Sequence, residues 1–327
     1  MGYVFALLAA LLFGANGSVT KVVLDSGLSP AQVTQFRTVG TCIIAGIVLL
    51  LIDRSAFRIP LRQVGTMAIL GVVGVALLQV TYAYAIQLMP VGIALLLEYL
   101  AVLIVALVAF FFFKERVKAR LWLAIGCVVV GLTIVAQIWA SNLNPFGVLM
   151  ALAAAATLSV YFIVGERQVT ATSPLAVAFW TSGFAALFWA FFSGWWNIDP
   201  AIFSKQVSLT GNLSGVIAPL WVVMTWMIVM GSFLPFLLSF SALGRLKATA
   251  AGIIASSEVI FAFVVAWLWL GEALTPFQLV GAAIVLVGII LAQTSRPNRV
   301  VDADLAMVAA TPGMNMTTDD HNVSGRT

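Results

Sequence analysis

Ten apolar segments, each close to twenty residues long, follow one another along this chain and limit its fold more than any other feature. A helix of about 20 apolar residues crosses the roughly 30 Å hydrocarbon core of a bilayer. Membrane β-strands alternate polar and apolar residues, whereas these segments do not, so helices are left to satisfy the backbone in lipid. The sequence therefore predicts an all-α polytopic membrane protein. Its ten transmembrane helices are expected at about residues 3–24, 30–52, 64–86, 91–113, 120–138, 145–165, 174–196, 218–243, 248–270 and 275–293.

Composition supports the same class. The chain is 62% hydrophobic and 9% charged, with a mean hydropathy of +1.11. A soluble domain carries about 25% charged residues to cover its surface, and this chain cannot do so. Only residues 295–327 are polar without periodicity, which predicts a disordered tail.

The basic residues predict how the chain crosses the membrane. If the N-terminus is cytoplasmic, thirteen basic residues fall in inner loops or the tail, and only Lys21 and Lys205 fall in outer loops. This bias predicts a multi-pass plasma-membrane protein with both termini in the cytoplasm. The basic residues are spread over separate loops, so nucleic-acid binding is not expected. The thirteen are Arg54, Arg58, Arg62, Lys114, Arg116, Lys118, Arg120, Arg167, Arg245, Lys247, Arg296, Arg299 and Arg326.

An internal repeat divides the ten segments into two sets of five. Residues in the first half recur 157 positions later, which predicts a first repeat over 1–143 and a second over 144–294. Because five is odd, the second copy would enter the membrane inverted. Inverted repeats place a substrate site near the bilayer midplane, between the halves. The matched pairs include Ala85 with Ala242, Ala94 with Ala251, Val102 with Val259, Glu115 with Glu272 and Gly131 with Gly288.

Two acids lie inside apolar segments, Glu98 in the fourth and Glu258 in the ninth. A charge facing lipid costs at least about 2.5–3.5 kcal/mol, so each acid should face a cavity, a partner or a proton. We expect Glu98 to bind substrate and Glu98 and Glu258 to couple transport to protons. The alternative is a protonated glutamic acid tied to a hydroxyl of a neighbour such as Tyr99 or Ser256, serving packing alone.

Other polar and aromatic groups in these segments are candidates to line a substrate cavity. Arg37 would meet a substrate carboxylate, or its side chain would instead extend to the membrane surface. The remaining polar groups would contact substrate or merely bridge helices. Trp180 and Phe184 would wall the cavity or pack in the core. The substrate-binding candidates beside Glu98 are Asn16, Gln35, Arg37, Gln79, Tyr82, Tyr99 and Trp180.

The sequence lacks the residue sets of most other function classes. Cys42 and Cys127 lie in apolar segments, and the single histidine, His321, lies in the tail. A transition-metal site, a nucleophile–histidine apparatus and a phosphate-binding P-loop are therefore not expected. We predict that the chain is not an enzyme and has no cofactor. Glu115 and Glu272, at the ends of apolar segments, are interpreted as capping or loop-fixing residues.

Several stretches resemble the EamA family of the drug/metabolite transporter superfamily over residues 3–293. They are QLMPVGIALLLEYLAVLIVAL at 87–107, ALGRLKATAAGII at 242–254, the following SSEV, and LGEALTPFQL at 270–279. They are most similar to the branch that exports threonine and homoserine. In that family a proline commonly follows the acid by a few residues. Here Tyr99 and Leu100 follow Glu98, and Val259 follows Glu258.

The resemblance implies a secondary transporter that exports small metabolites, most simply amino acids such as threonine or homoserine, by alternating access with proton coupling. A cationic-drug or other metabolite exporter of the same superfamily is the alternative. From another class, a membrane sensor or scaffold that transports nothing stays open. A phosphate exchanger is disfavoured because it should have several buried basic residues, and only Arg37 lies well inside an apolar segment. The expected partners are a small-molecule substrate, lipid and protons, and a homodimer is allowed.

Overall fold

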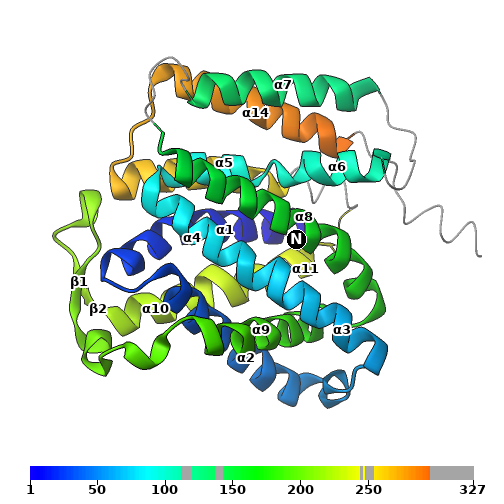
Figure 1. The fold of residues 1–327 in the computed structure, drawn as a ribbon, viewed down its shortest axis with the longest axis vertical. Helices are drawn as coiled ribbons and strands as arrows, with labels where there is room; N and C mark the ends of the chain where they lie inside the picture. The colour runs from blue at the N-terminus through cyan, green and yellow to red at the C-terminus, as the bar shows by residue number, and fades with distance from the viewer. Residues whose placement is uncertain (112–118, 137–142, 244–245, 247–253, 295–327) are drawn as a thin grey trace, which may run out of the picture. The chain divides into compact units, whose positions relative to one another are not determined.

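The first half of the chain is a series of helices in the computed structural model (Figure 1). The structure describes residues 1–111, 119–136, 143–243, 246 and 254–294, all within the compact unit Met1–Arg296. A π-helical stretch joins α3 and α4 into one continuous helix. The elements are α1 (Gly2–Asp25), α2 (Pro30–Ile52), η1 (Arg54–Phe57), α3 (Leu61–Ile69), η2 (Leu70–Leu77), α4 (Leu78–Leu88), α5 (Val91–Glu98), α6 (Ala101–Phe111) and α7 (Ala119–Ala136).

The second half is also mostly helical and contains a small sheet. Between α9 and α10 lie three 3-10 turns and two short antiparallel strands, in which Gln206 pairs with Pro219. The helices are α8 (Pro145–Ala171), α9 (Pro174–Phe192), α10 (Leu220–Ile228), η6 (Val229–Phe233), α11 (Leu234–Leu243), α13 (Ser257–Val265), η7 (Ala266–Leu270) and α14 (Pro276–Thr294). The connecting elements are η3 (Trp195–Asn197), η4 (Pro200–Ser204), β1 (Gln206–Ser208), η5 (Gly211–Leu213) and β2 (Ile217–Pro219).

Three helices begin where the sequence supplies both a cap and a proline. Ser29 Oγ accepts a hydrogen bond from the Gln32 backbone N–H, and Gln32 Oε1 accepts one from the Ser29 backbone N–H. Ser173 and Asn144 cap α9 and α8, each followed by a proline. A cap satisfies backbone donors that a helix start leaves unpaired, and proline at the first position has no N–H to satisfy.

Six helical stretches are long and apolar enough to cross a membrane. They are Gly2–Asp25, Pro30–Ile52, Leu61–Leu88, Pro145–Gly165, Leu175–Phe192 and Leu220–Ser239. The other predicted segments appear as shorter apolar helices, Val91–Val105, Arg120–Val135, Ser257–Leu270 and Pro276–Ala292. The chain is thus a mostly helical, multi-pass membrane protein. Of the ten predicted spans, six are helices of full spanning length among the described residues, and four are shorter.

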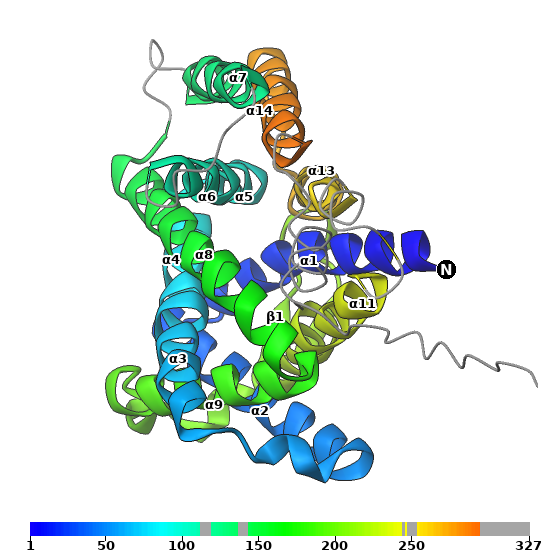
Figure 2. The ribbon, with the colours of Figure 1, turned by 90° about the vertical axis from the view of Figure 1, so that its right-hand side faces the viewer.

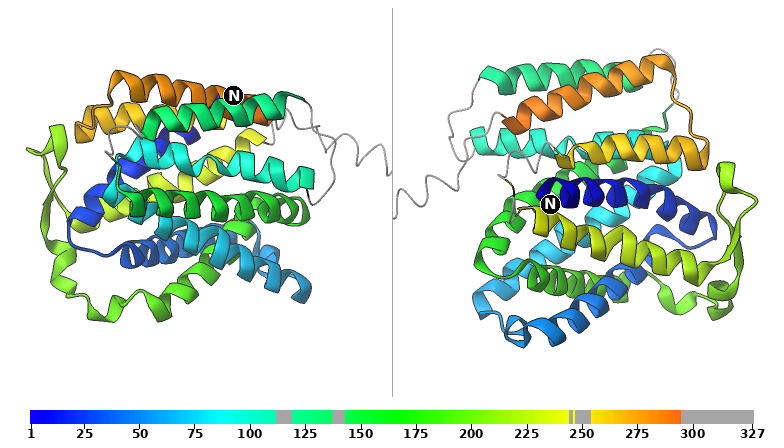
Figure 3. Two further views of the ribbon diagram at one scale, coloured as in Figure 1. Left: turned by 45° about the horizontal axis from the view of Figure 1, so that its top comes forward. Right: turned by 180° about the vertical axis from the view of Figure 1, so that it is seen from behind.

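Three helices of the first half pack against their counterparts by order in the second: α2 on α9, α5 on α13 and α7 on α14 (Figures 1 and 3). Glycines bring the last pair into backbone contact. A Cβ on Gly131 would lie 2.8 Å from the Gly281 carbonyl oxygen, and one on Gly288 would lie 2.9 Å from that of Ala124. Since residue numbers rise along α7 as they fall along α14, this pair is antiparallel.

The other two counterpart pairs are antiparallel by the same criterion. Gly92 of α5 lies against Phe263, and Tyr99 at the end of that helix reaches Glu258 at the start of α13. On α2 and α9, Gly46 lies against Phe179, while Cys42 lies against Gly183. The two helices of each of these three pairs therefore run in opposite directions.

Helix α1 passes through the middle of the described unit, beside α4, α11 and α13 (Figure 2). Two glycines permit this close approach. A Cβ on Gly14 would lie 2.7 Å from the Glu258 carbonyl oxygen, and one on Gly17 would lie 2.5 Å from the Tyr82 hydroxyl. Side chains from α1, α4, α5 and α13 consequently share one buried region, which is where the candidate site lies.

Candidate functional site

The helix that carries Glu98 is broken directly after it. Tyr99 N–H still donates to Leu95 O at 3.0 Å, but Leu100 N–H donates to Leu97 O at 3.1 Å, three residues back. The chain then resumes as α6 at Ala101. The sequence predicted one uninterrupted segment over 91–113, and this is wrong at Tyr99 and Leu100. A tightened turn interrupts the helix here without a proline.

Glu258 also lies beside a turn. Ser256 is in a turn conformation, Val259 N–H donates to Ser256 O at 3.3 Å, and α13 begins at Ser257. Both acids therefore adjoin interruptions of apolar helices. Discontinuous helices are where membrane transporters place ion and substrate sites, because the backbone there has groups outside the regular helical ladder.

The two acids have different partners. Tyr99 Oη donates to Glu258 Oε2 at 2.6 Å and contacts the Ala255 carbonyl oxygen at 3.3 Å. Glu98 is 9% exposed, and its Oε2 has no hydrogen-bond partner in the described part of the chain. A buried polar atom without a partner is costly. Of the two acids, Glu258 is thus tied across α5 and α13, whereas Glu98 Oε2 is left without a partner among the described residues.

Arg37 turns inward rather than extending to the membrane surface. Its Nε donates to Ser232 Oγ at 2.6 Å, and its Nη2 donates to Gly231 O at 3.2 Å. The Asn16 amide faces the same guanidinium. With the amide turned so that its oxygen points to Arg37, that oxygen accepts from Nη2 at 3.0 Å and from Nη1 at 3.2 Å. Two other elements, α1 and η6, thus hold the Arg37 side chain of α2 in place.

Arg37 is not in a direct ion pair with either acid. Over residues 1–111, 119–136, 143–243 and 254–294, the one ion pair joins Lys21 to Glu272. Arg37 is nevertheless close enough to interact electrostatically with Glu98, Glu258 and Tyr82. The arrangement separates a fixed cation from an available carboxylate, as the two ends of a zwitterion require.

The sequence did not identify the partners of Arg37 on η6. Gly231 must lack a side chain, since a Cβ there would overlap the Asn16 amide, and Ser232 supplies the hydroxyl. They lie in a π-helical stretch, a distortion that is frequent at functional sites. The available signal was a Gly-Ser pair inside an otherwise apolar segment, which is weak because small residues also mediate plain helix packing.

Six predicted site residues are connected to this region: Asn16, Arg37, Tyr82, Glu98, Tyr99 and Glu258. Gln35 is 7% exposed, and its Oε1 has no partner within the described ranges, but no contact links it to the two acids. Trp180 stacks on Phe184 with ring centroids 6.0 Å apart, in a separate cluster with Met67, Leu70 and Val177. Its contact with substrate stays a prediction.

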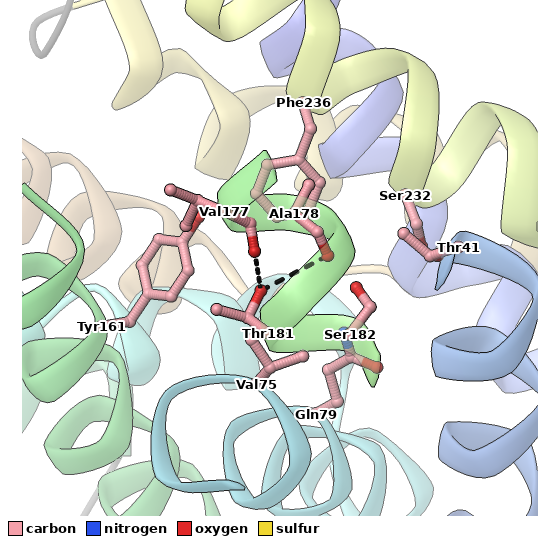
Figure 4. Close-up of a pocket in the computed structure, with 10 residues that line it drawn as sticks. All are labelled: Thr41, Val75, Gln79, Tyr161, Val177, Ala178, Thr181, Ser182, Ser232 and Phe236. Atoms are coloured by element: carbon pink, nitrogen blue, oxygen red, sulfur yellow. Dashed lines mark hydrogen bonds between the residues drawn. The ribbon is translucent and has the colours of Figure 1, made fainter. Parts of the chain in front are cut away.

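Gln79 lines a small cavity (Figure 4), and so does Ser232, which accepts the hydrogen bond from Arg37 Nε. The cavity has a volume of about 20 Å³, enough for a water molecule. Thr41, Ser182 and Ser232 also line it.

Glu272 fixes the loop before α14, as the sequence predicted. Its partners, however, lie on α1 and at the start of α5 and not on α14. Its Oε1 pairs with Lys21 Nζ at 2.5 Å, and its Oε2 accepts from Val91 N–H at 2.8 Å, at the start of α5. An acid at a helix N-terminus is stabilised by the helix dipole. Glu115 lies outside the described residues. In the part of the chain that the structure describes, no three His, Cys, Asp or Glu side chains gather as metal ligands would.

Comparison with known proteins agrees with this architecture. The model of the EamA-like transporter family matches residues 1–137 and 145–294. A solved crystal structure resembles the fold with a TM-score of 0.60 at 17% sequence identity, covering 95% of this chain and 99% of that one.

Two curated relatives share part of the sequence. An uncharacterized transporter of Archaeoglobus fulgidus is 27% identical over 212 residues, or 65% of this chain and 70% of that protein. The threonine/homoserine exporter RhtA of Escherichia coli strain K12 is 28% identical over 217 residues. The second match spans 65% of this chain and 66% of the length of that exporter.

Proposed function

Because the chain belongs to the EamA-like transporter family, we propose that it exports small zwitterionic metabolites, most simply amino acids such as threonine or homoserine. The observation that carries this proposal is the placement of Arg37 and Glu98 in one buried region. The guanidinium is held by hydrogen bonds, whereas Glu98 Oε2 has no partner among the described residues. The similarity to a threonine/homoserine exporter supports the same substrate class.

The two ends of an amino acid need opposite charges. The substrate ammonium would bind Glu98, whose buried carboxylate would otherwise be costly to ionise. The substrate carboxylate would approach Arg37 at Nη1, the nitrogen that Ser232 and Gly231 leave unused. An arginine fork suits a carboxylate because it presents several N–H donors in one plane.

The proposed proton coupling rests on Glu98 offering one carboxylate to two cations. A proton and a substrate ammonium compete for the same carboxylate, so entry of a proton would release the substrate, and the reverse. Glu258 would hold the second carboxylate near this site through its bond to Tyr99. Export would then be driven by protons moving inward.

Alternating access would come from two inverted repeats, 1–143 and 144–294. The antiparallel packing of α2 on α9, α5 on α13 and α7 on α14 supports this proposal, since a copy inserted upside down runs opposite to its counterpart. The interruptions beside Glu98 and Glu258 support it further. Both termini would face the cytoplasm, as the distribution of basic residues predicts.

The test is Glu98→Gln, which keeps the shape of the side chain and removes its charge and its proton. Cells that overexpress the wild-type chain should tolerate excess threonine or homoserine, and the variant should lose this tolerance at equal membrane abundance. In vesicles, wild-type transport should respond to an imposed pH gradient. Asp199→Asn, which removes the charge of an exposed carboxylate and keeps its shape, is the matched change outside the site.

Three results would contradict parts of the proposal. Full tolerance with Glu98→Gln would remove Glu98 from the mechanism. Transport indifferent to the pH gradient would mean a carrier without proton coupling. Tolerance to cationic dyes but not to amino acids would favour the drug exporter, and no transported compound at all would favour a sensor or scaffold.

A further inference from the structure

The small cavity lined by Gln79 shares one residue, Ser232, with the hydrogen-bond partners of the Arg37 guanidinium. Ser232 lines the cavity and accepts the hydrogen bond from Arg37 Nε. Thr41 lines it too, and its Oγ1 donates to the Arg37 carbonyl oxygen at 2.8 Å. Ser232 thus contacts the Arg37 guanidinium and also lines this cavity.

The walls of the cavity offer hydrogen-bonding groups. Figure 4 shows Gln79 and Ser182 close together, with Thr41 and Ser232 from other helices nearby. Gln79 Oε1 is buried and has no partner among the residues described. Thr181 Oγ1 already donates to Val177 O at 2.7 Å, so its hydrogen is committed and its oxygen can only accept. Among the described residues, Gln79 Oε1 is therefore the acceptor that lacks a donor in this cavity.

Its size limits what could supply that donor. A volume of about 20 Å³ holds one water-sized group and excludes a whole amino acid. A methyl group would fit as well, but it would leave Gln79 Oε1 buried without a hydrogen bond, which is costly. An O–H group satisfies both the size and the missing donor.

We propose that this cavity is a subsite for a hydroxyl on the substrate side chain. The inference rests on the function proposed above and deepens it: the substrates are hydroxyl-bearing amino acids rather than aliphatic ones of equal size. Gln79 accepts the hydroxyl hydrogen, and Ser182 and Ser232 are the polar groups around its oxygen. A site built to bond a hydroxyl discriminates strongly against an analogue that lacks it, because its own polar groups are then left unpaired.

The test compares threonine with valine, which have the same shape and differ in the hydroxyl. The full chain is reconstituted in liposomes, and transport of both amino acids is measured for wild type, Gln79→Leu and Ser182→Ala. Wild type should prefer threonine by about tenfold or more. Both variants should lower this ratio several-fold while valine transport is kept or increased. Thr225→Val is the control, since this hydroxyl lies on an exposed face of α10 and bonds only to Trp221 O.

The outcomes separate this proposal from the one on which it rests. If wild type transports threonine and valine equally, the subsite is wrong while amino-acid export stands. If wild type prefers threonine and Ser182→Ala and Gln79→Leu keep that preference, the cavity holds a water molecule only. If Gln79→Leu fails to insert, Ser182→Ala alone decides. If wild type carries neither amino acid, the proposed function fails first and the subsite fails with it.

Discussion

Glu98 and Glu258 are the same residue type in equivalent apolar surroundings, yet their neighbours give them different chemistry. The Tyr99 hydroxyl is committed to Glu258, so that carboxylate is held in place. Glu98 follows the chain into the same turn but receives no such bond from the described residues. One tyrosine therefore decides which acid is available.

We expect Tyr99→Phe to act through Glu258. The change removes the 2.6 Å hydrogen bond and leaves a buried carboxyl oxygen with one partner fewer, which should lower the free energy of unfolding by about 1–3 kcal/mol. Thermal unfolding in detergent measures this loss. In a double-mutant cycle with Glu258→Gln, the two changes should be non-additive by about 0.5–3 kcal/mol. Tyr84→Phe, on the outward face of α4, is the control, and additive effects would show that the bond contributes nothing.

A second prediction at this scale concerns Arg37→Lys. Lysine keeps the charge, but its ammonium cannot reach Ser232, Gly231 and Asn16 together in the plane that the guanidinium fork provides. Transport should fall by about tenfold or more with the protein still inserted. Flux in vesicles, normalised to membrane abundance, measures the effect. Wild-type flux in the lysine variant would mean that charge alone is required of this residue.

Helices in this protein are held together where glycine removes the side chain between them. The α7–α14 contact is the clearest case, with Gly131, Gly281 and Gly288 each within van der Waals reach of the opposite backbone. Neither helix gains from the hydrophobic effect inside lipid, so close backbone packing has to supply the attraction. Where a glycine lies along such a helix therefore matters more than how many glycines the helix contains.

Gly131→Ala tests this packing. Its added Cβ would lie 2.8 Å from Gly281 O and 2.9 Å from Val285 N, and backbone atoms cannot move aside as a flexible side chain can. We expect a loss of about 1–3 kcal/mol in stability. Gly126→Ala on the same helix is the matched control, because nothing lies within 4 Å of its added Cβ. Its effect should stay within about 0.5 kcal/mol, and equal losses at both positions would implicate helix propensity instead.

For the molecule as a whole, our proposal is that the arrangement of the two halves connects the fold to transport. The counterpart helices that touch are antiparallel, and α1 lies between elements of both halves. In an inverted repeat, the two copies can exchange conformations and open the site to one side and then to the other.

The predicted topology places Ser55 and Ser214, both exposed, on opposite sides of the membrane. With Cys42 and Cys127 replaced by alanine, Ser214→Cys should react with a membrane-impermeant maleimide in intact cells. Ser55→Cys should react only after the cells are permeabilised. Labelling of both positions in intact cells would overturn the proposed orientation.

The sequence by itself determined the class of protein and its charged candidates. The length and composition of an apolar segment are local properties, and the bilayer core accepts a segment on these properties alone. The helices and their approximate order therefore follow from the sequence. Glu98, Glu258 and Arg37 were also identifiable, because a charge inside an apolar segment is expensive wherever the segment packs.

Only the tertiary structure decided which groups meet. The bond from Tyr99 to Glu258, the contacts of Arg37 with Gly231 and Ser232, and the placement of Gln79 on a separate cavity join residues that are far apart in the chain. Trp180 and Phe184 were recognisable as neighbours on one helix face, but their cluster was not. The reason is physical: helix periodicity fixes the direction of a side chain about its own axis, whereas its partner depends on how closely whole helices pack.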